Sequence, residues 1–171
     1  MVDISAKNKS KLIRHEVAKY LTKKGNSCHF EVGLNKWGKL RADIYAFSFK
    51  RVATVVEVKS SWTDYKSDKK WSGYLCFANK MYFAVAQDFE LKPEFIDALR
   101  EKGVGLLVVN LDLPSSRLNR YHSSSVTCEL NAKSRKVKGD IKRDILVRIA
   151  YRNGMLRTNK NSWLNQVKDL S

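Results

Sequence analysis

The sequence predicts an α/β domain in which helices flank a mixed β-sheet, in the element order α-β-β-β-α-β with a further helix near the C-terminal end. Two observations support this prediction. Three strand-like runs follow an N-terminal helical pattern with no helix between them, which indicates an antiparallel meander. Further along, a strand-like run, a helical run and another strand-like run imply a right-handed crossover and parallel pairing.

The first element is a helix predicted over Ser5–Lys24. Gly25 ends it, because glycine readily adopts the backbone conformation that closes a helix. Four residues recur at helical spacing and mark its buried face: Ile13, Val17, Tyr20 and Leu21.

Three strands are predicted next. His29–Leu34 comes first, and the turn-like segment Asn35–Lys39 separates it from Arg41–Phe49. Val52–Ser60 follows after a short turn. The short connection predicts that these last two strands pair as a hairpin.

The segment Ser61–Lys80 is predicted to be a helix or a broken helix, which Ser61 or Thr63 can cap. Trp71 and Tyr74 lie three positions apart, on one helical face. They are either packed in the core or available to stack on an unpaired base.

A buried strand is then predicted over Lys80–Ala86, a helix over Leu91–Lys102, and a second apolar strand over Val104–Asn110. Strand, helix and strand in this order favour the parallel crossover. The segment Leu111–Gly139 is hydrophilic and reads mainly as loop, in which Val126–Leu130 is a possible short strand.

The C-terminal region carries an apolar stripe typical of a helix that docks on a core. Gly154 is predicted to end this helix. We therefore expect a core over residues 1–110 and, over residues 111–171, a basic loop and a C-terminal helix packed on that core, as one domain overall. The stripe consists of Ile141, Ile145, Leu146, Ile149 and Ala150.

The composition favours a nucleic acid as the partner. The chain has 171 residues, of which 43% are apolar, and a formal net charge of +16. A strongly basic globular domain most often binds a polyanion. An anionic membrane is the weaker alternative, because the sequence has no long basic amphipathic helix and no apolar run long enough to span a bilayer.

Three cysteines, Cys28, Cys76 and Cys128, occur without a C-x-x-C pair, and this favours reduced thiols. No histidine has zinc-ligand spacing with them. The polar N-terminal stretch does not resemble a secretory signal. We expect a cytoplasmic protein, associated with the nucleoid or with a host cytoplasm. A homodimer is compatible with the sequence, but no pattern indicates one.

The stretch Arg41–Ser61 contains the residues with the clearest chemistry. Glu57 and Lys59 lie two positions apart on the second strand of the hairpin, so they point to the same face. Asp43, on the first strand, can lie level with Glu57. A charged pair in so apolar a strand is costly unless it is paired or holds an ion. Two carboxylates and one ammonium are therefore expected to converge.

This set of side chains suits the metal-assisted hydrolysis of a phosphodiester. Two carboxylates can hold a hard divalent cation such as Mg²⁺ or Mn²⁺, which lowers the pKa of a bound water. Lys59 can orient that water and pair with a phosphate oxygen. The spacing leaves one alternative open, a surface hairpin whose charged side chains face solvent, because a D-x(n)-E-x-K match is short and common.

Asp43 followed by Glu57-Val58-Lys59 resembles the signature of the PD-(D/E)xK nucleases, which have a restriction-endonuclease-like fold; Ala42 stands where the signature has proline. The continuation is most similar to the MmcB-like DNA-repair branch, in which acid-x-Lys-Ser-Ser precedes D-[FY]-x-x-D-x-KW-x-x-Y. The resemblance covers roughly residues 13–110. The matching positions after the strand are Asp64, Tyr65, Asp68, Lys70, Trp71 and Tyr74.

The resemblance implies roles for individual residues. Asp43 and Glu57, with the backbone carbonyl of Val58, would bind the metal, and Lys59 would serve the attacking water and the scissile phosphate.

Many members of the superfamily also carry a glutamate on the first helix that touches the metal or its water, and Glu16 is the candidate for it here. The alternative is that Glu16 pairs with Lys19 or Lys23 at the border of the buried face.

Candidate DNA contacts lie beside the site and in the C-terminal segment. Those beside the site would bind phosphates, which position DNA without reading its sequence. The second group would be an accessory contact to the DNA backbone. A solvated basic surface is the alternative for both. The residues are Ser60, Ser61, Lys66, Lys69 and Lys70, and then Lys133, Arg135, Lys136 and Lys138.

Together these patterns predict a Mg²⁺- or Mn²⁺-dependent endo- or exodeoxyribonuclease that acts in DNA repair, recombination or phage DNA processing. Two alternatives remain. One is a DNA-binding module that has a nuclease-like fold without cleavage, and the other is a protein directed to RNA.

Overall fold

The computed structural model describes residues 6–35, 39–112 and 125–160. The chain divides into two compact units, Met1–Val137 and Lys138–Ser171. Each unit is described by itself. Within the described residues, no helix is both long enough and apolar enough to cross a membrane.

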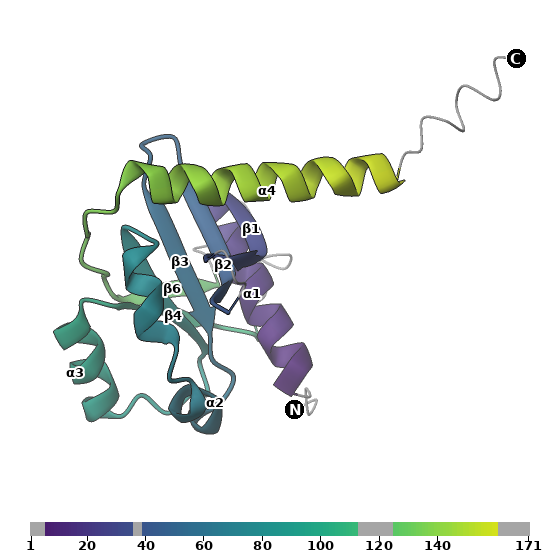
Figure 1. The fold of residues 1–171 in the computed structure, drawn as a ribbon. Helices are drawn as coiled ribbons and strands as arrows, with labels where there is room; N and C mark the ends of the chain where they lie inside the picture. The colour runs from purple at the N-terminus through teal and green to yellow at the C-terminus, as the bar shows by residue number, and fades with distance from the viewer. Residues whose placement is uncertain (1–5, 36–38, 113–124, 161–171) are drawn as a thin grey trace, which may run out of the picture. The chain divides into compact units, whose positions relative to one another are not determined.

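The first unit follows the predicted α-β-β-β-α-β order, and the predicted fold class is confirmed (Figure 1). Its elements are α1 (Ala6–Lys23), β1 (Asn26–Gly33), β2 (Arg41–Ser48), β3 (Ala53–Val58), α2 (Trp62–Ser67), the 3₁₀ helix η1 (Trp71–Cys76), β4 (Lys80–Ala86), α3 (Pro93–Lys102), β5 (Gly105–Val109) and β6 (Val126–Leu130).

The sheet has six strands in the order β1-β2-β3-β4-β5-β6. The pairs β1–β2 and β2–β3 are antiparallel, as the predicted meander requires. The pairs β3–β4 and β4–β5 are parallel, as the predicted crossover requires, and β6 closes the sheet in antiparallel pairing. Since β3, β4 and β5 run in the same direction, their carboxyl ends lie along one edge of the sheet.

Helices cover both faces of this sheet (Figure 1). Tyr82 and Ala84 of β4 belong to a buried cluster that includes Ile13 of α1. Phe83 lies between them in the strand, so its side chain points to the opposite face. Its ring contacts there come from α2, η1 and α3: Tyr65, Trp71 and Phe95. The sheet is therefore packed on both sides, and β3 has no exposed residue.

The predicted broken helix after β3 is confirmed. It consists of α2 and η1, and residues 68–70 separate them. The possible strand Val126–Leu130 is also confirmed as β6.

The second unit contains α4 (Gly139–Lys160). The prediction that Gly154 ends this helix is wrong, because the helix continues to Lys160. A glycine inside a helix costs only about 1 kcal/mol relative to alanine, and good helix formers such as Met155 and Leu156 follow it. The predicted packing of this helix on the core stays a prediction.

Candidate active site

The two acidic residues Asp43 and Glu57 lie side by side on neighbouring strands. Ile44 of β2 pairs with Val56 of β3, and one step along this register brings Asp43 opposite Glu57. The backbone N–H of Asp43 donates to Glu57 Oε1 at 3.2 Å, and the N–H of Val58 donates to Asp43 Oδ2 at 2.8 Å. The hairpin therefore holds both carboxylates through its own backbone, as the predicted register requires.

Burial and mutual repulsion make both carboxylates hard to ionise. Burial is the main cause that raises the pKa of Glu57 to about 9, and the nearby Asp43 carboxylate adds to it. Burial also raises the pKa of Asp43, although the Val58 N–H works against that rise. A divalent cation between the two groups would remove the repulsion and stabilise both charged forms.

The residues present fit such a cation. Asp43 Oδ1 and Glu57 Oε2 accept no hydrogen bond from the described residues. No group of three or more histidine, cysteine or acidic side chains in the described part of the chain could hold a metal. A cation here would therefore take the two carboxylates and complete its shell with the Val58 carbonyl and water. Mg²⁺ accepts such a set, because it usually keeps several waters.

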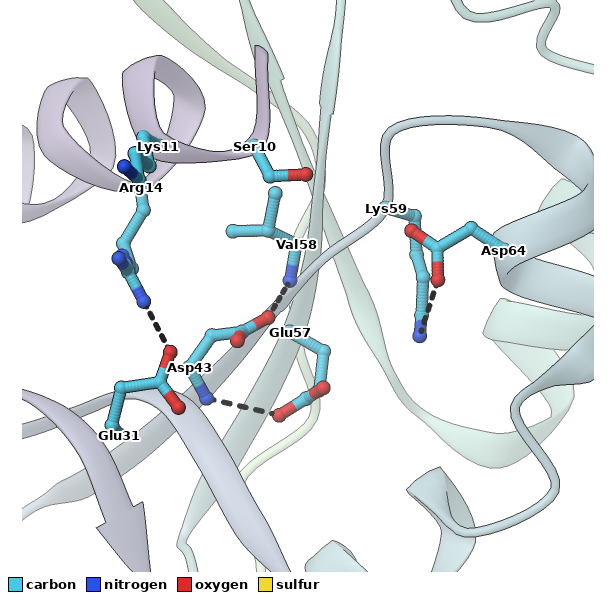
Figure 2. Close-up of a pocket in the computed structure, with 9 residues that line it drawn as sticks. All are labelled: Ser10, Lys11, Arg14, Glu31, Asp43, Glu57, Val58, Lys59 and Asp64. Carbon is cyan, nitrogen blue, oxygen red and sulfur yellow. Dashed lines mark hydrogen bonds and ion pairs between the residues drawn. The ribbon is translucent and has the colours of Figure 1, made fainter. Parts of the chain in front are cut away.

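Lys59 follows β3 directly and is 4% exposed. Its Nζ lies 2.6 Å from Asp68 Oδ2. It also lies 3.7 Å from Asp64 Oδ1, and Figure 2 shows this second ion pair. The ammonium also lies 5.9 Å from the centre of the Phe83 ring. The structure therefore brings Lys59 to the pocket of Asp43 but pairs its charge with the acidic residues that follow it.

The local sequence explains how Asp64 reaches this position. Ser61 caps the N-terminus of α2, and its Oγ accepts the N–H of Asp64 at 3.2 Å. Asp64 Oδ2 in turn accepts the N–H of Ser60 at 3.0 Å. The capping predicted for Ser61 is confirmed. Ser60 and Ser61, which we predicted as DNA contacts, take part in hydrogen bonds at the start of α2, and a role toward DNA stays a prediction.

A pocket of ≈ 550 Å³ opens over these residues. Figure 2 shows two differently charged walls, with Asp43 and Glu57 on the strands and Lys11 and Arg14 on α1. The full lining is Ser10, Lys11, Arg14, Glu31, Asp43, Glu57, Val58, Lys59 and Asp64.

Four of these lining residues were missed by the sequence analysis: Ser10, Lys11, Arg14 and Glu31. Glu31 lies between Phe30 and Val32, which pair with β2 on either side of Asp43. Its carboxylate is bound by Arg14 and lies 3.0 Å from Arg41 Nε. Extending the hairpin register by one more strand would have found Glu31. No spacing in the sequence indicates that α1 reaches the same point.

Glu16, the predicted first-helix helper, is not brought to the pocket. Its side chain is 5% exposed, accepts from Lys19 Nζ at 3.0 Å, and accepts from Ser125 Oγ at 2.7 Å. The alternative reading, in which Glu16 pairs with Lys19, describes its position. The residues of α1 that line the pocket, Ser10, Lys11 and Arg14, lie two to six positions before Glu16.

The predicted DNA contacts are placed differently from one another. Lys66, Lys69 and Lys70 are exposed and follow the pocket-lining segment in the chain. Lys133 and Lys136 are exposed too. Lys138 is the first residue of the second unit. Arg135 differs from them, because its guanidinium donates to the carbonyls of Lys102 and, at 2.9 Å, Gly103. It therefore closes the C-terminal end of α3.

Trp71 and Tyr74 have packing roles. The Trp71 ring meets Phe83 edge-on at 5.5 Å, and Tyr74 is buried with its hydroxyl donating to the Arg41 carbonyl at 3.4 Å. Both positions agree with the interpretation that these residues pack in the core rather than stack on a base.

Comparison with known proteins supports one family. The sequence model of a family described as DNA repair protein MmcB-like matches residues 1–162. The resemblance to this branch is confirmed, and it extends well beyond the residues 13–110 expected from the motif. Membership of the wider PD-(D/E)xK superfamily stays a prediction. No curated protein matches the chain.

One solved structure with the same fold is that of a protein of unknown function from Silicibacter pomeroyi. It aligns with a TM-score of 0.68 and 21% sequence identity over 94% of this chain and 95% of that chain. At this identity the likeness shows the fold alone.

Proposed function

Because the chain belongs to the family of MmcB-like DNA repair proteins, we propose that it is a divalent-metal-dependent DNA nuclease whose active site contains Asp43, Glu57 and Lys59. The family relates the chain to DNA. The proposal adds two claims to this relation: that the protein cleaves DNA, and that a divalent metal is required for the cleavage.

One observation carries the proposal. Glu57 is buried, the half-buried Asp43 lies next to it, and each leaves one oxygen without a hydrogen bond from the described residues. Two adjacent carboxylates of raised pKa destabilise a fold unless a cation binds them. Such a pair is therefore better explained by metal binding than by a structural role.

Asp43, Glu57 and the Val58 carbonyl would hold Mg²⁺ or Mn²⁺. When bound, the metal would lower the pKa of a coordinated water and neutralise charge on a phosphoryl oxygen. The protein's own part is to fix this pair on a hairpin backbone, in the lining of a pocket of ≈ 550 Å³.

Lys59 would act as a fixed positive charge beside the reacting phosphate. Asp68 and Asp64 hold its ammonium in a defined place, so Lys59 loses little conformational entropy when the substrate binds.

A second candidate function is DNA binding without cleavage. The pairing of Lys59 with Asp68, rather than with a group in the acidic pair, favours it. The two functions agree on DNA as the partner and differ only in whether the backbone is cut. A role directed to RNA is a further alternative that the substrate panel below tests.

The test is a cleavage assay of the purified protein with Mg²⁺ or Mn²⁺ on duplex, single-stranded and branched DNA, with RNA alongside. Glu57→Gln and Lys59→Ala are the site variants. Asp97→Asn is the matched control, because Asp97 also forms an ion pair but is 72% exposed and lies on α3. We expect metal-dependent products from the wild type and the control only. Tight DNA binding with no products under either metal would favour the second candidate.

A further inference from the structure

We propose that Arg14, together with Lys11, forms a binding site for a backbone phosphate of DNA, and that Glu31 occupies Arg14 while that phosphate is absent. The inference rests on the proposed function only in taking DNA as the ligand of the pocket.

Basic and acidic side chains line the same pocket. Lys11 and Arg14 are three positions apart on α1, so they share one side of the helix, and both line the pocket. Asp43 and Glu57 line the same pocket. A phosphodiester fits between such walls, because its oxygens can meet a cation bound by the acids and a guanidinium at once.

Two neighbouring residues of β1 contact Arg14. Its guanidinium binds the Glu31 carboxylate and lies 5.4 Å from the centre of the Phe30 ring. Phe30 contacts the cation without consuming its hydrogen-bond donors, so it can keep the guanidinium in place when the anion changes. Arg14 is thus already positioned for an anion.

Two features of Glu31 favour this exchange. Glu31 has a φ of 53°, in the left-handed region that costs a non-glycine residue free energy. Glu31 is also bound by Arg41, whose side chain is 65% exposed. If Arg14 moves to a phosphate, Glu31 keeps this second partner, so the exchange leaves no carboxylate unpaired. The backbone strain and the two arginines together indicate that the position is used for more than packing.

The experiment measures DNA binding in EDTA, where no cleavage occurs, by fluorescence anisotropy of a short labelled duplex across a range of salt. The variants are Arg14→Gln, Glu31→Gln and the double variant. Arg100→Gln is the matched control, because it removes the same charge from an ion pair on α3 that does not line the pocket.

One phosphate contact is worth roughly eightfold in affinity at 0.1 M salt by counterion release, so Arg14→Gln should lose about that factor and flatten the salt slope by about 1. Glu31→Gln should bind up to about fivefold more tightly, as expected for the release of a partly exposed ion pair. This gain in affinity separates the proposal from misfolding, which would only weaken binding.

The double variant decides whether Glu31 acts through Arg14. The proposal expects the gain from Glu31→Gln to disappear when Arg14 is absent. An equal gain in both backgrounds would mean that Glu31 only repels DNA as a charge, and it would overturn the exchange. If Arg14→Gln and Arg100→Gln bind DNA with the same affinity, Arg14 does not bind a backbone phosphate and the proposal fails. If the variants bind DNA as expected but the wild type does not cleave it, the proposed nuclease activity is refuted and the phosphate site is still supported.

Discussion

At Glu57 two physical effects act in the same direction. Burial and the neighbouring Asp43 raise the pKa of its carboxyl to about 9, from an ordinary value of 4.5. Below that ordinary value both the folded and the unfolded chain hold the proton, and burial of the carboxyl costs little. As the pH rises from there toward 9, the unfolded chain gains the free energy of ionisation and the folded chain does not, so the fold loses stability.

Glu57→Gln should therefore stabilise the metal-free protein in a pH-dependent way. We expect the free energies of unfolding of variant and wild type to agree near pH 4 and to separate as the pH rises, by at most roughly 3 kcal/mol at pH 7. Glutamine keeps the oxygen that accepts the Asp43 N–H. Denaturant unfolding in EDTA at several pH values measures the difference. Parallel pH profiles of the two proteins would show that Glu57 ionises normally.

At the level of single residues, the sequence predicted the acidic pair but not all the residues that line the pocket. Strand alternation and one hairpin are local, so they place Asp43 beside Glu57 without further information. Glu16 was proposed because many members of the superfamily carry a glutamate on the first helix, yet helical spacing does not tell which end of the sheet a residue reaches. Arg14 reaches the pocket through the tertiary placement of α1, which no short motif encodes.

Among the elements, α3 depends on a residue that the sequence assigned to DNA. The Arg135 guanidinium binds the carbonyls of Lys102 and Gly103 at the end of α3, and burial lowers its pKa. Its backbone also exchanges two hydrogen bonds of 2.8 Å with Asn79. A charge cluster read from sequence cannot distinguish such a capping arginine from exposed neighbours such as Lys136.

Arg135→Ala should therefore destabilise the protein by about 1–3 kcal/mol, because it leaves helix-terminal carbonyls without a charged donor. Lys133→Ala and Lys136→Ala remove the same charge from exposed side chains and should stay within about 0.5 kcal/mol of wild type. Urea unfolding of the three variants makes the comparison. If Arg135→Ala is as stable as the wild type but binds DNA more weakly, Arg135 is a DNA contact, as the sequence predicted.

Element boundaries were predicted well where a local signal decides them. β4 was predicted with its observed bounds, because an apolar run ends in the polar residues Gln87 and Asp88. The end of α4 was missed, because Gly154 is a stop signal only when the backbone turns left-handed after the helix, as it does at Gly25 with a φ of 78°. Sequence alone does not reveal which glycine will do so.

For the whole molecule, the net charge of +16 predicts strong salt dependence of DNA binding. With about 5–8 phosphate contacts, the slope of log K against log salt should be roughly −5 to −7 for duplex DNA. Titrations of one duplex between low and moderate salt measure this slope. A flat dependence would indicate that the charge serves another partner, such as an acidic protein.

The central claim is that Asp43 and Glu57 form the metal-binding centre of a DNA nuclease. The most direct measurement compares wild type with Asp43→Asn, which is nearly isosteric and removes the like-charge repulsion without opening a cavity. Both proteins are incubated with plasmid DNA and Mg²⁺ or Mn²⁺, and thermal unfolding confirms that both are folded. We predict metal-dependent nicks or breaks with wild type and none above background with the variant. Cleavage by Asp43→Asn at the wild-type rate would contradict the account.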